Sequence, residues 1–357
     1  MDSTIRIVLL GDSLILKSMK NLVEHDERFG RVQSILREAD LVFAECENPL
    51  TTKGVPAEKI ITVRGDPSIV NDLKMLGYDA VTLANNHAMD YGWEGLSETM
   101  DTLRENGIKY VGAGKNLDEA WSPLVIQQKG IRIGFVAFSN TLAMGFAAGP
   151  RRPGVAPIHV TTLYENQLLW MLEEPGSPPV IKTEASDEDR ELLKKSLKRA
   201  KEQCDFLIAV PHWGRGSQEE VLEYQKLLGH DMVENGVDLI YGMHAHVVHP
   251  VEIYKRVPII YCMNNFIFHA PSEWVDLIGR EAFEYFLEPE SFIVRATLTE
   301  RKLSRVEFIP IKHDRGGNPY LASKELGDSM INRLAKISSD FSAKIEKREG
   351  IAELVLT

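Results

Sequence analysis

The sequence predicts an α/β protein whose main strands run parallel. Short apolar runs, typical of buried strands, alternate with stretches of helical period. Glycines close several helical stretches before the next apolar run begins, as at Gly77 and Gly107. Strand, helix and strand in that order predict right-handed crossovers between parallel strands, so the carboxyl ends of the strands should share one edge.

The first half of the chain repeats this unit. The opening apolar run, 5–10, ends at Asp12, so this strand stops with a carboxylate at its tip. The next run, 41–44, ends at Glu45, and Pro49 prevents it from continuing. The other elements expected here are helices at 14–22, 68–76 and 93–106 and strands at 80–84, 109–111 and 131–138.

A stretch without a clear period, 141–183, separates these units from the rest of the chain. It is rich in glycine and proline, and loops of this length usually cover a functional site or serve as linkers. Because Trp170 has apolar neighbours, we expect a partly ordered cover. Downstream we expect helices at 188–203, 218–235 and 324–346, buried strands at 206–210 and 237–241, and antiparallel strands at 251–254, 259–263, 292–299 and 303–310.

Composition and charge exclude several classes of protein. A chain of 357 residues with 44% hydrophobic residues can bury a large core, and we expect one domain over 1–315 on which a helix and apolar tail, 316–357, pack. The formal net charge of -11 argues against a nucleic-acid partner. No stretch reaches the roughly 18 apolar residues of a membrane span, so we expect a cytoplasmic protein without a membrane anchor. The cysteines, expected to be buried thiols in a reducing compartment, are Cys46, Cys204 and Cys262.

Polar side chains occupy five strand ends. His244 and His246 share one side of an extended segment, so both can reach one metal centre. Carboxyl ends of strands form the ligand crevice of open α/β sheets, so residues far apart in sequence can meet there. Carboxylate, imidazole and amide ligands suit Mn²⁺, Fe²⁺ or Zn²⁺ better than Ca²⁺. The side chains concerned are Asp12, Glu45, Glu47, Asn86, His87, His212, His244 and His246.

Six segments carry motifs at these strand ends: Gly11-Asp12, 40–51, 83–92, His212-Trp213-Gly214, 242–247 and 260–266. Together they resemble the motif series of the CapA-type capsule and poly-γ-glutamate biosynthesis proteins, which are relatives of the calcineurin-like metallophosphoesterases. The resemblance extends over residues 5–315. It implies a four-layer α-β-β-α sandwich of two mixed sheets with metals bound at the strand ends.

The resemblance also implies two metal positions, for one or two ions of Mn, Fe or Zn. The phosphoesterases usually carry Asp-x-His at the first strand end, where this chain has Leu14, which cannot bind a metal. Two alternatives therefore remain: the site holds a single metal ion, or Glu45 replaces the missing ligand. The implied ligands are Asp12 and His246 for the first metal, Glu47 as the bridge, and Asn86, His212 and His244 for the second.

Further residues have implied catalytic or substrate-binding roles. His87 would act as an acid or electrophile, oriented by a hydrogen bond to Asp90. Many CapA-like proteins place Glu two residues after the His-Trp-Gly motif, and this chain has Gly216 there. Paired arginines in a polar loop are usually solvated, and Asn265 can belong to a turn. The candidates for substrate binding are Arg64, Arg151, Arg152, Arg215 and Asn265.

Three functions follow from these expectations. The first is a metal-dependent hydrolase that cleaves a phosphoester or amide bond of a small anionic substrate or oligomer, through a metal-activated water. The second is a non-catalytic role in making, exporting or anchoring poly-γ-glutamate or a capsule, which would usually require an amino-terminal membrane anchor. Because no such anchor is expected, we favour the hydrolase. The third is a binding or sensor module that holds a ligand without turnover; the sequence does not predict the substrate or the oligomeric state.

Overall fold

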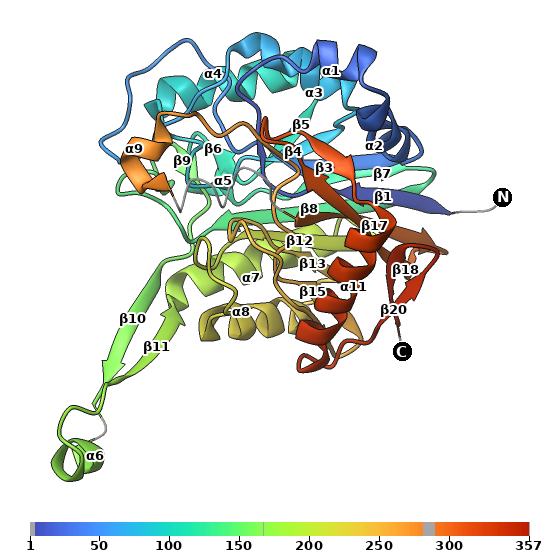
Figure 1. The fold of residues 1–357 in the computed structure, drawn as a ribbon. Coiled ribbons are helices and arrows are strands. Elements are labelled where there is room, and N and C mark those ends of the chain that lie inside the picture. The colour runs from blue at the N-terminus through green and yellow to red at the C-terminus, as the bar shows by residue number, and fades with distance from the viewer. Residues whose placement is uncertain (1–3, 167, 281–289, 357) are drawn as a thin grey trace.

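Two mixed sheets stacked face to face form the centre of the protein (Figure 1). The structure, a computed structural model, describes residues 4–166, 168–280 and 290–356. Helices cover the outer face of each sheet, which gives four layers (Figure 1). The expected fold class, an α-β-β-α sandwich of mixed sheets, is confirmed.

The first sheet has nine strands, and its central pairs are parallel. Its order is β20 (Ile345–Arg348), β21 (Ile351–Leu354), β18 (Lys302–His313), β17 (Glu290–Thr299), β1 (Ile5–Leu9), β3 (Leu41–Glu45), β4 (Ala80–Thr82) and β5 (Lys109–Val111), with β19 (Pro319–Leu321) beside β18. Strands β1, β3, β4 and β5 run parallel, as the crossovers predict, while β17 lies antiparallel to β1. The carboxyl ends of β1, β3 and β4 therefore point to the same edge.

The second sheet has six strands and a parallel centre. Its order is β14 (Val251–Tyr254), β15 (Val257–Ile260), β13 (Leu239–Tyr241), β12 (Phe206–His212), β8 (Ile131–Ser139) and β7 (Leu124–Gln128). Strand β15 lies antiparallel to β14 but parallel to β13, so the strand expected at 259–263 is antiparallel on one side only. The rings of Phe43 and Phe135 stack between the sheets with centroids 4.4 Å apart. This contact joins two sheets that share one core.

Amphipathic helices form the outer layers. In α4 (Gly92–Glu105) the side chains of Leu96, Met100 and Leu103 follow helical spacing and are buried against the sheet, as the pattern predicts. Within the described residues, no helix is both long and apolar enough to cross a membrane. The first sheet is covered by α1 (Lys20–His25), α2 (Glu27–Arg37), a 3-10 turn (Pro67–Ile69), α3 (Val70–Met75) and α4 (Gly92–Glu105); the second by α7 (Asp187–Lys201) and α8 (Glu223–Glu234), with α11 (Lys324–Ser339) packed on β14 and β18.

Two expected helices are shorter than predicted. Residues 14–22 do not form one helix, because β2 (Ser13–Leu14) pairs with β16 (Ile267–Phe268) and helical structure begins only at Lys20. The C-terminal helix ends at Ser339 rather than near residue 346. Its continuation forms the β20–β21 hairpin, because β21 can pair with β18 and complete backbone hydrogen bonds along that edge.

The loosely patterned stretch 141–183 divides into a part on the body and a projecting arm. The first part includes β9 (Gly154–Val155), which pairs with β6 (Ala113–Gly114) beside the short helix α5 (Leu117–Ala120). The second part continues as an antiparallel hairpin of β10 (Val160–Glu165) and β11 (Val180–Ala185), with α6 (Leu168–Glu173) at its far end. The hairpin points away from the body (Figure 1), so this part does not form the expected cover. Phe146, in the first part, lies 5.5 Å from the Lys59 ammonium.

Candidate metal centre

The strand ends of the two sheets bring two groups of possible metal ligands together. One group is Asp12, Glu47 and His246, and the other is Asp12, Glu45 and His212. Within each group the ligand atoms lie within 4.8 Å of one another. Asp12 follows β1, whereas His212 ends β12, so the site spans both sheets. Asp12 is the carboxylate that the two groups share.

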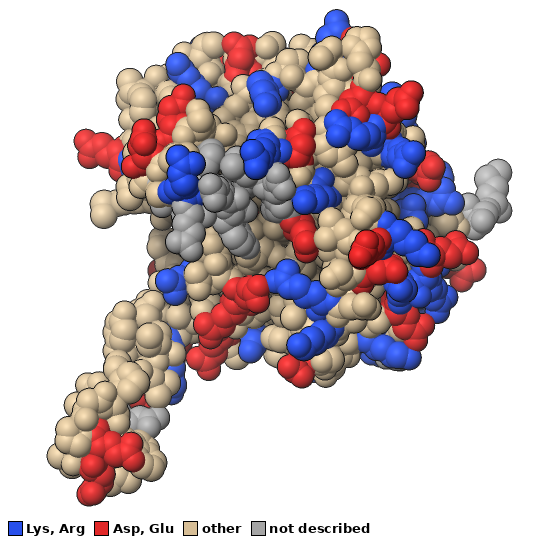
Figure 2. Space-filling model, in the orientation of Figure 1, with Lys and Arg blue, Asp and Glu red and all other residues tan. Residues whose placement is uncertain are grey.

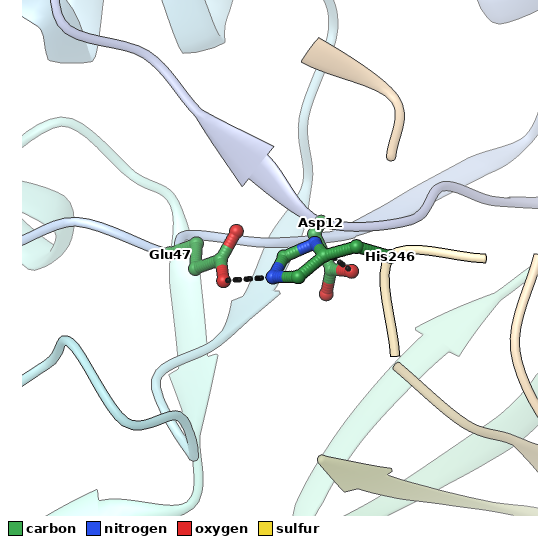
Figure 3. A group of neighbouring side chains, drawn as sticks. All are labelled: Asp12, Glu47 and His246. Atoms are coloured by element: carbon green, nitrogen blue, oxygen red, sulfur yellow. Dashed lines mark ion pairs between the residues drawn. The ribbon is translucent and has the colours of Figure 1, made fainter. Parts of the chain in front are cut away.

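In the first group the imidazole of His246 lies between two carboxylates (Figure 3). Its Nε2 is 3.6 Å from Glu47 Oε1, and its Nδ1 is 3.5 Å from Asp12 Oδ2. Nδ1 also donates a hydrogen bond to Asn265 Oδ1 at 2.7 Å, because an amide oxygen only accepts. Asn265, expected to bind substrate, thus orients the ring so that Nε2 points toward Glu47.

In the second group an imidazole nitrogen faces a carboxylate without bonding to it. His212 Nε2 donates to Asn86 Oδ1 at 2.9 Å, which leaves a lone pair on Nδ1. Nδ1 lies 2.9 Å from Glu45 Oε1, yet within the described part of the chain neither atom has a hydrogen-bond partner. A lone pair and an ionised carboxylate oxygen repel each other at this distance, so without a cation the contact requires a proton on Glu45. A cation near both atoms would convert this repulsion into two ligand bonds.

The structure groups the candidate carboxylates and imidazoles differently from the assignment that the resemblance implies, and that assignment stays a prediction. Asp12, rather than Glu47, belongs to both groups, and Glu45 joins His212. Asn86 contacts His212 through its amide oxygen. His244 contributes its backbone N–H, which donates to Asp12 Oδ1 and Oδ2 at 3.2 and 3.3 Å. Its ring centroid lies 4.6 Å from that of His212, so the ring remains close to the second group.

Burial makes this cluster unfavourable without a cation. Asp12 and Glu45 are fully buried, and Glu47 is 1% exposed. Burial raises the pKa of Glu45 and of Glu47 well above the ordinary value; the next cause is a side-chain hydrogen bond with Asp12 for Glu45 and the charge of Asp12 for Glu47. Burial also lowers the pKa of His212 well below its ordinary value, which keeps the imidazole neutral and able to bind a metal. The donor set therefore fits a divalent transition-metal ion.

His87 forms a second buried network beside these groups. Its Nδ1 donates to Asp90 Oδ2 at 2.7 Å, as the resemblance implies, and Val63 N donates to the same oxygen at 2.7 Å. Lys59 Nζ donates to Asp90 Oδ1 and to Asn86 O, both at 2.7 Å. No sequence pattern marks Lys59, because it lies in a link between two strands. Burial lowers the pKa of His87, against the raising effect of Asp90.

The four candidate arginines lie outside both ligand groups. The Arg64 guanidinium lies 4.6 Å from the centre of the Tyr91 ring, and Arg152 donates to the carbonyl of Ala147. Arg64, Arg151, Arg152 and Arg215 are exposed. Their role in binding an anionic substrate stays a prediction.

Two glycines allow the strand ends to approach each other. A Cβ on Gly11 would lie 1.8 Å from Asn264 O, and one on Gly242 would lie 2.2 Å from Tyr261 O. His244 and His246, which follow Gly242, have φ values of 93° and 53°. Such values are uncommon for residues with side chains and concentrate at functional sites. The backbone between the two sheets is thus shaped around the ligand groups.

Residues 6–270 match the family described as "Bacterial capsule synthesis protein PGA_cap". The chain belongs to this family. The CapA-type resemblance is therefore confirmed. Relatives include the PGA biosynthesis protein CapA of Bacillus subtilis, 26% identical over 97% of this chain and 81% of that protein. The capsule biosynthesis protein CapA of Bacillus anthracis is 26% identical over 73% of this chain and 59% of its own length.

Further relatives of this PGA_cap chain include a probable polyglutamine synthesis accessory protein of Mycobacterium tuberculosis, 25% identical over 88% of this chain and 77% of that protein. A hypothetical protein from Thermus thermophilus matches in structure with a TM-score of 0.43 and 14% identity, over 88% of this chain and 95% of its own. A putative 5'-nucleotidase from Staphylococcus aureus matches with a TM-score of 0.42 and 15% identity, over 90% of this chain and 53% of its own.

Proposed function

We propose that this PGA_cap protein is a metal-dependent hydrolase of a small anionic substrate or oligomer. The observation that carries the proposal is Asp12, a buried carboxylate shared by two ligand groups that each include a second carboxylate and an imidazole. When bound there, Mn²⁺, Fe²⁺ or Zn²⁺ would act as a Lewis acid and lower the pKa of a water molecule. The site would take one or two ions, held by Asp12, Glu45, Glu47, His212 and His246.

The chain's own residues would position the substrate and move a proton. Asp90 accepts the Nδ1–H of His87, so Nε2 carries the lone pair and is the atom that would first accept a proton and then pass it to a leaving group. Lys59 places a positive charge against Asp90 at 2.7 Å. Arg64, Arg151, Arg152 and Arg215 would attract the anionic part of the substrate from the exposed side. Both phosphoester and amide bonds belong to the proposed substrate class.

The experiment is metal analysis followed by a substrate screen. Protein purified without chelators is analysed for metal, loaded with Mn²⁺, Fe²⁺ or Zn²⁺, and assayed on a panel of phosphoesters and γ-linked glutamyl amides. We expect His212→Ala to lose at least about 100-fold in activity while its melting temperature stays near that of the unmodified chain. His25→Ala is the matched control, because the side chain of His25 is 70% exposed. The proposal fails if His212→Ala and the unmodified chain behave alike across the panel.

A second candidate function is a non-catalytic role in assembling a capsule polymer. The family description and the names of the relatives favour it, since they refer to capsule and poly-γ-glutamate synthesis. In that case the ligand groups would hold a metal that binds carboxylates of the polymer without cleaving it. Metal-dependent binding of poly-γ-glutamate with no product formation on the whole panel would favour this function over the hydrolase.

A further inference from the structure

The arm carries an exposed apolar tip at its far end. We define the arm tip as residues 168–174, which include α6. Leu168, Leu169 and Leu172 are 69%, 68% and 71% exposed, and Trp170 is 50% exposed. A contiguous group of large apolar side chains in water is unfavourable and usually marks a surface that another molecule covers.

The charges around the arm tip are all negative. Between residues 161 and 181 the chain has no Lys or Arg. Glu165 is paired with Lys182 of the same hairpin at 2.6 Å, so the acidic residues that the arm tip offers to a partner are Glu173 and Glu174. Acidic side chains gather at the far end of the arm (Figure 2). Helices that lie on membranes usually carry Lys and Arg around their apolar face, since lipid surfaces are often anionic. The arm tip therefore fits a protein surface with an apolar floor and a basic rim.

The body of the same chain has a groove of this kind between α5 and α7. We call it the α5–α7 groove, with a volume of about 420 Å³. Its apolar lining comes from Leu117, Trp121 and Leu192. The Trp121 indole N–H is buried and has no hydrogen-bond partner among the described residues. The exposed charged residues that line the groove are three basic ones, Lys195, Lys198 and Arg199, and two acidic ones, Asp118 and Glu202, so the basic residues are in excess.

The base of the arm holds the tip away from the chain's own body. Six residue pairs join β10 and β11. Two hydrogen bonds anchor the base of the arm. Tyr224 N of α8 donates to Thr183 Oγ1 at 3.3 Å, and Ser186 N, just before α7, donates to His159 O at 2.8 Å. The tip lies far from the body (Figure 1). Its partner groove must therefore belong to another molecule.

We propose that the arm tip of one copy docks into the α5–α7 groove of a second copy. The second copy returns the same contact, which closes a two-fold dimer with two identical interfaces. The apolar side chains of the tip cover Leu117, Trp121 and Leu192, while the acidic residues pair with the basic rim. This inference is independent of the proposed hydrolase activity, because no ligand of the metal groups takes part.

The test is a complementation experiment read by sedimentation velocity over a range of protein concentrations. The tip variant is Trp170→Glu, and the groove variant is the double change Lys195→Glu with Lys198→Glu. We expect a dimer for the unmodified chain and dimerisation at least roughly 30-fold weaker for each variant. Mixing the two variants should restore part of the dimerisation, because the mixed dimer has one intact tip–groove contact whereas a dimer of either variant alone has none.

Matched controls change similar side chains elsewhere on the surface. Val55→Glu replaces an apolar residue that is 76% exposed, and Lys302→Glu reverses an exposed charge at the β17–β18 turn. Both should dimerise like the unmodified chain. A monomeric unmodified chain, an unaffected Trp170→Glu dimer, or variants that do not recover on mixing would overturn the proposal. It is also overturned if the unmodified chain stays monomeric but sediments with phosphatidylcholine vesicles through Trp170, since the tip would then bind lipid.

Discussion

Asp12 accepts the backbone N–H of His244 at 3.2 Å and belongs to both ligand groups, whereas the Asn86 side chain accepts from Nε2 of His212, the ring nitrogen that does not face Glu45. We therefore expect Asp12→Asn to weaken metal binding more than Asn86→Ala does. Loss of an orienting residue typically costs about 10–100-fold in metal affinity, and loss of a shared charged ligand should exceed that. Competition titration with a chelating dye measures the metal affinity of each variant. If Asn86→Ala lost more metal affinity than Asp12→Asn, Asn86 would itself be a metal ligand, as the resemblance implies.

His269 gives the protein a pH-dependent stability away from the ligand groups. Burial, and then the charge of Lys17, lower its pKa from 6.5 to about 4. Between these values the unfolded chain binds a proton that the folded chain does not, so stability falls as pH falls. We expect the unmodified chain to lose about 1 kcal/mol more between pH 6 and pH 5 than His269→Asn, which keeps an acceptor for Leu16 N. Urea unfolding at both pH values measures the difference, and equal losses would contradict the prediction.

At the residue scale, the sequence identifies most of the candidate site but not its pairing. Asp12, Glu47, His212 and His246 could be found because polar residues directly after buried strands stand out from an apolar background. Which carboxylate is shared depends on side-chain directions where two sheets meet, and strand patterns do not specify these. Lys59 could not be found, since its partners Asp90 and Asn86 reach it only after the loop between β3 and β4 has folded back.

The stacked pair of Phe43 on β3 and Phe135 on β8 couples the two sheets directly. The ring planes are inclined by 6°, and both side chains are fully buried. In a double-mutant cycle of Phe43→Leu and Phe135→Leu, we expect a coupling energy of about 0.5–1.5 kcal/mol. Either single variant already loses the stacking interaction, so the double variant cannot lose it a second time. Urea unfolding in the presence of a chelator measures it. Strictly additive losses would mean that the sheets are held by area burial alone.

At the element scale, elements with one buried face were predictable and those without one were not. The helix expected at 93–106 is observed as Gly92–Glu105, since its apolar stripe faces the sheet. Strands β10 and β11 were not predicted, because both faces of the arm are largely exposed and the sequence therefore shows no alternation of apolar and polar residues. The helix expected at 324–346 was extended into the start of β20, and β21 falls in the expected apolar tail, because the pairing of this hairpin with β18 is long-range and leaves no local pattern.

At the scale of the whole molecule, a metal bound in the ligand groups would tie the two sheets together. The carboxylates come from the first sheet, and His212 and His246 come from the second. A ligand that binds only the folded state stabilises it by about 2.7 kcal/mol at 100 times its Kd. We expect Mn²⁺ to raise the melting temperature by several degrees over chelator-treated protein. Asp12→Asn should show little of this gain, and an equal gain in that variant would place the ion elsewhere.

The position of Asp12 in the chain has a consequence for biosynthesis. The backbone N–H that bonds to its carboxylate belongs to a residue 232 positions later. A ribosome adds about 5–20 residues per second, so roughly 10–50 s pass between the synthesis of the two residues. During that interval the carboxylates of the first sheet exist without their imidazole partners. A metal held by all of these ligands would therefore bind only after His246 has been made, and a nascent chain that stalls before His212 would carry the carboxylates without either imidazole.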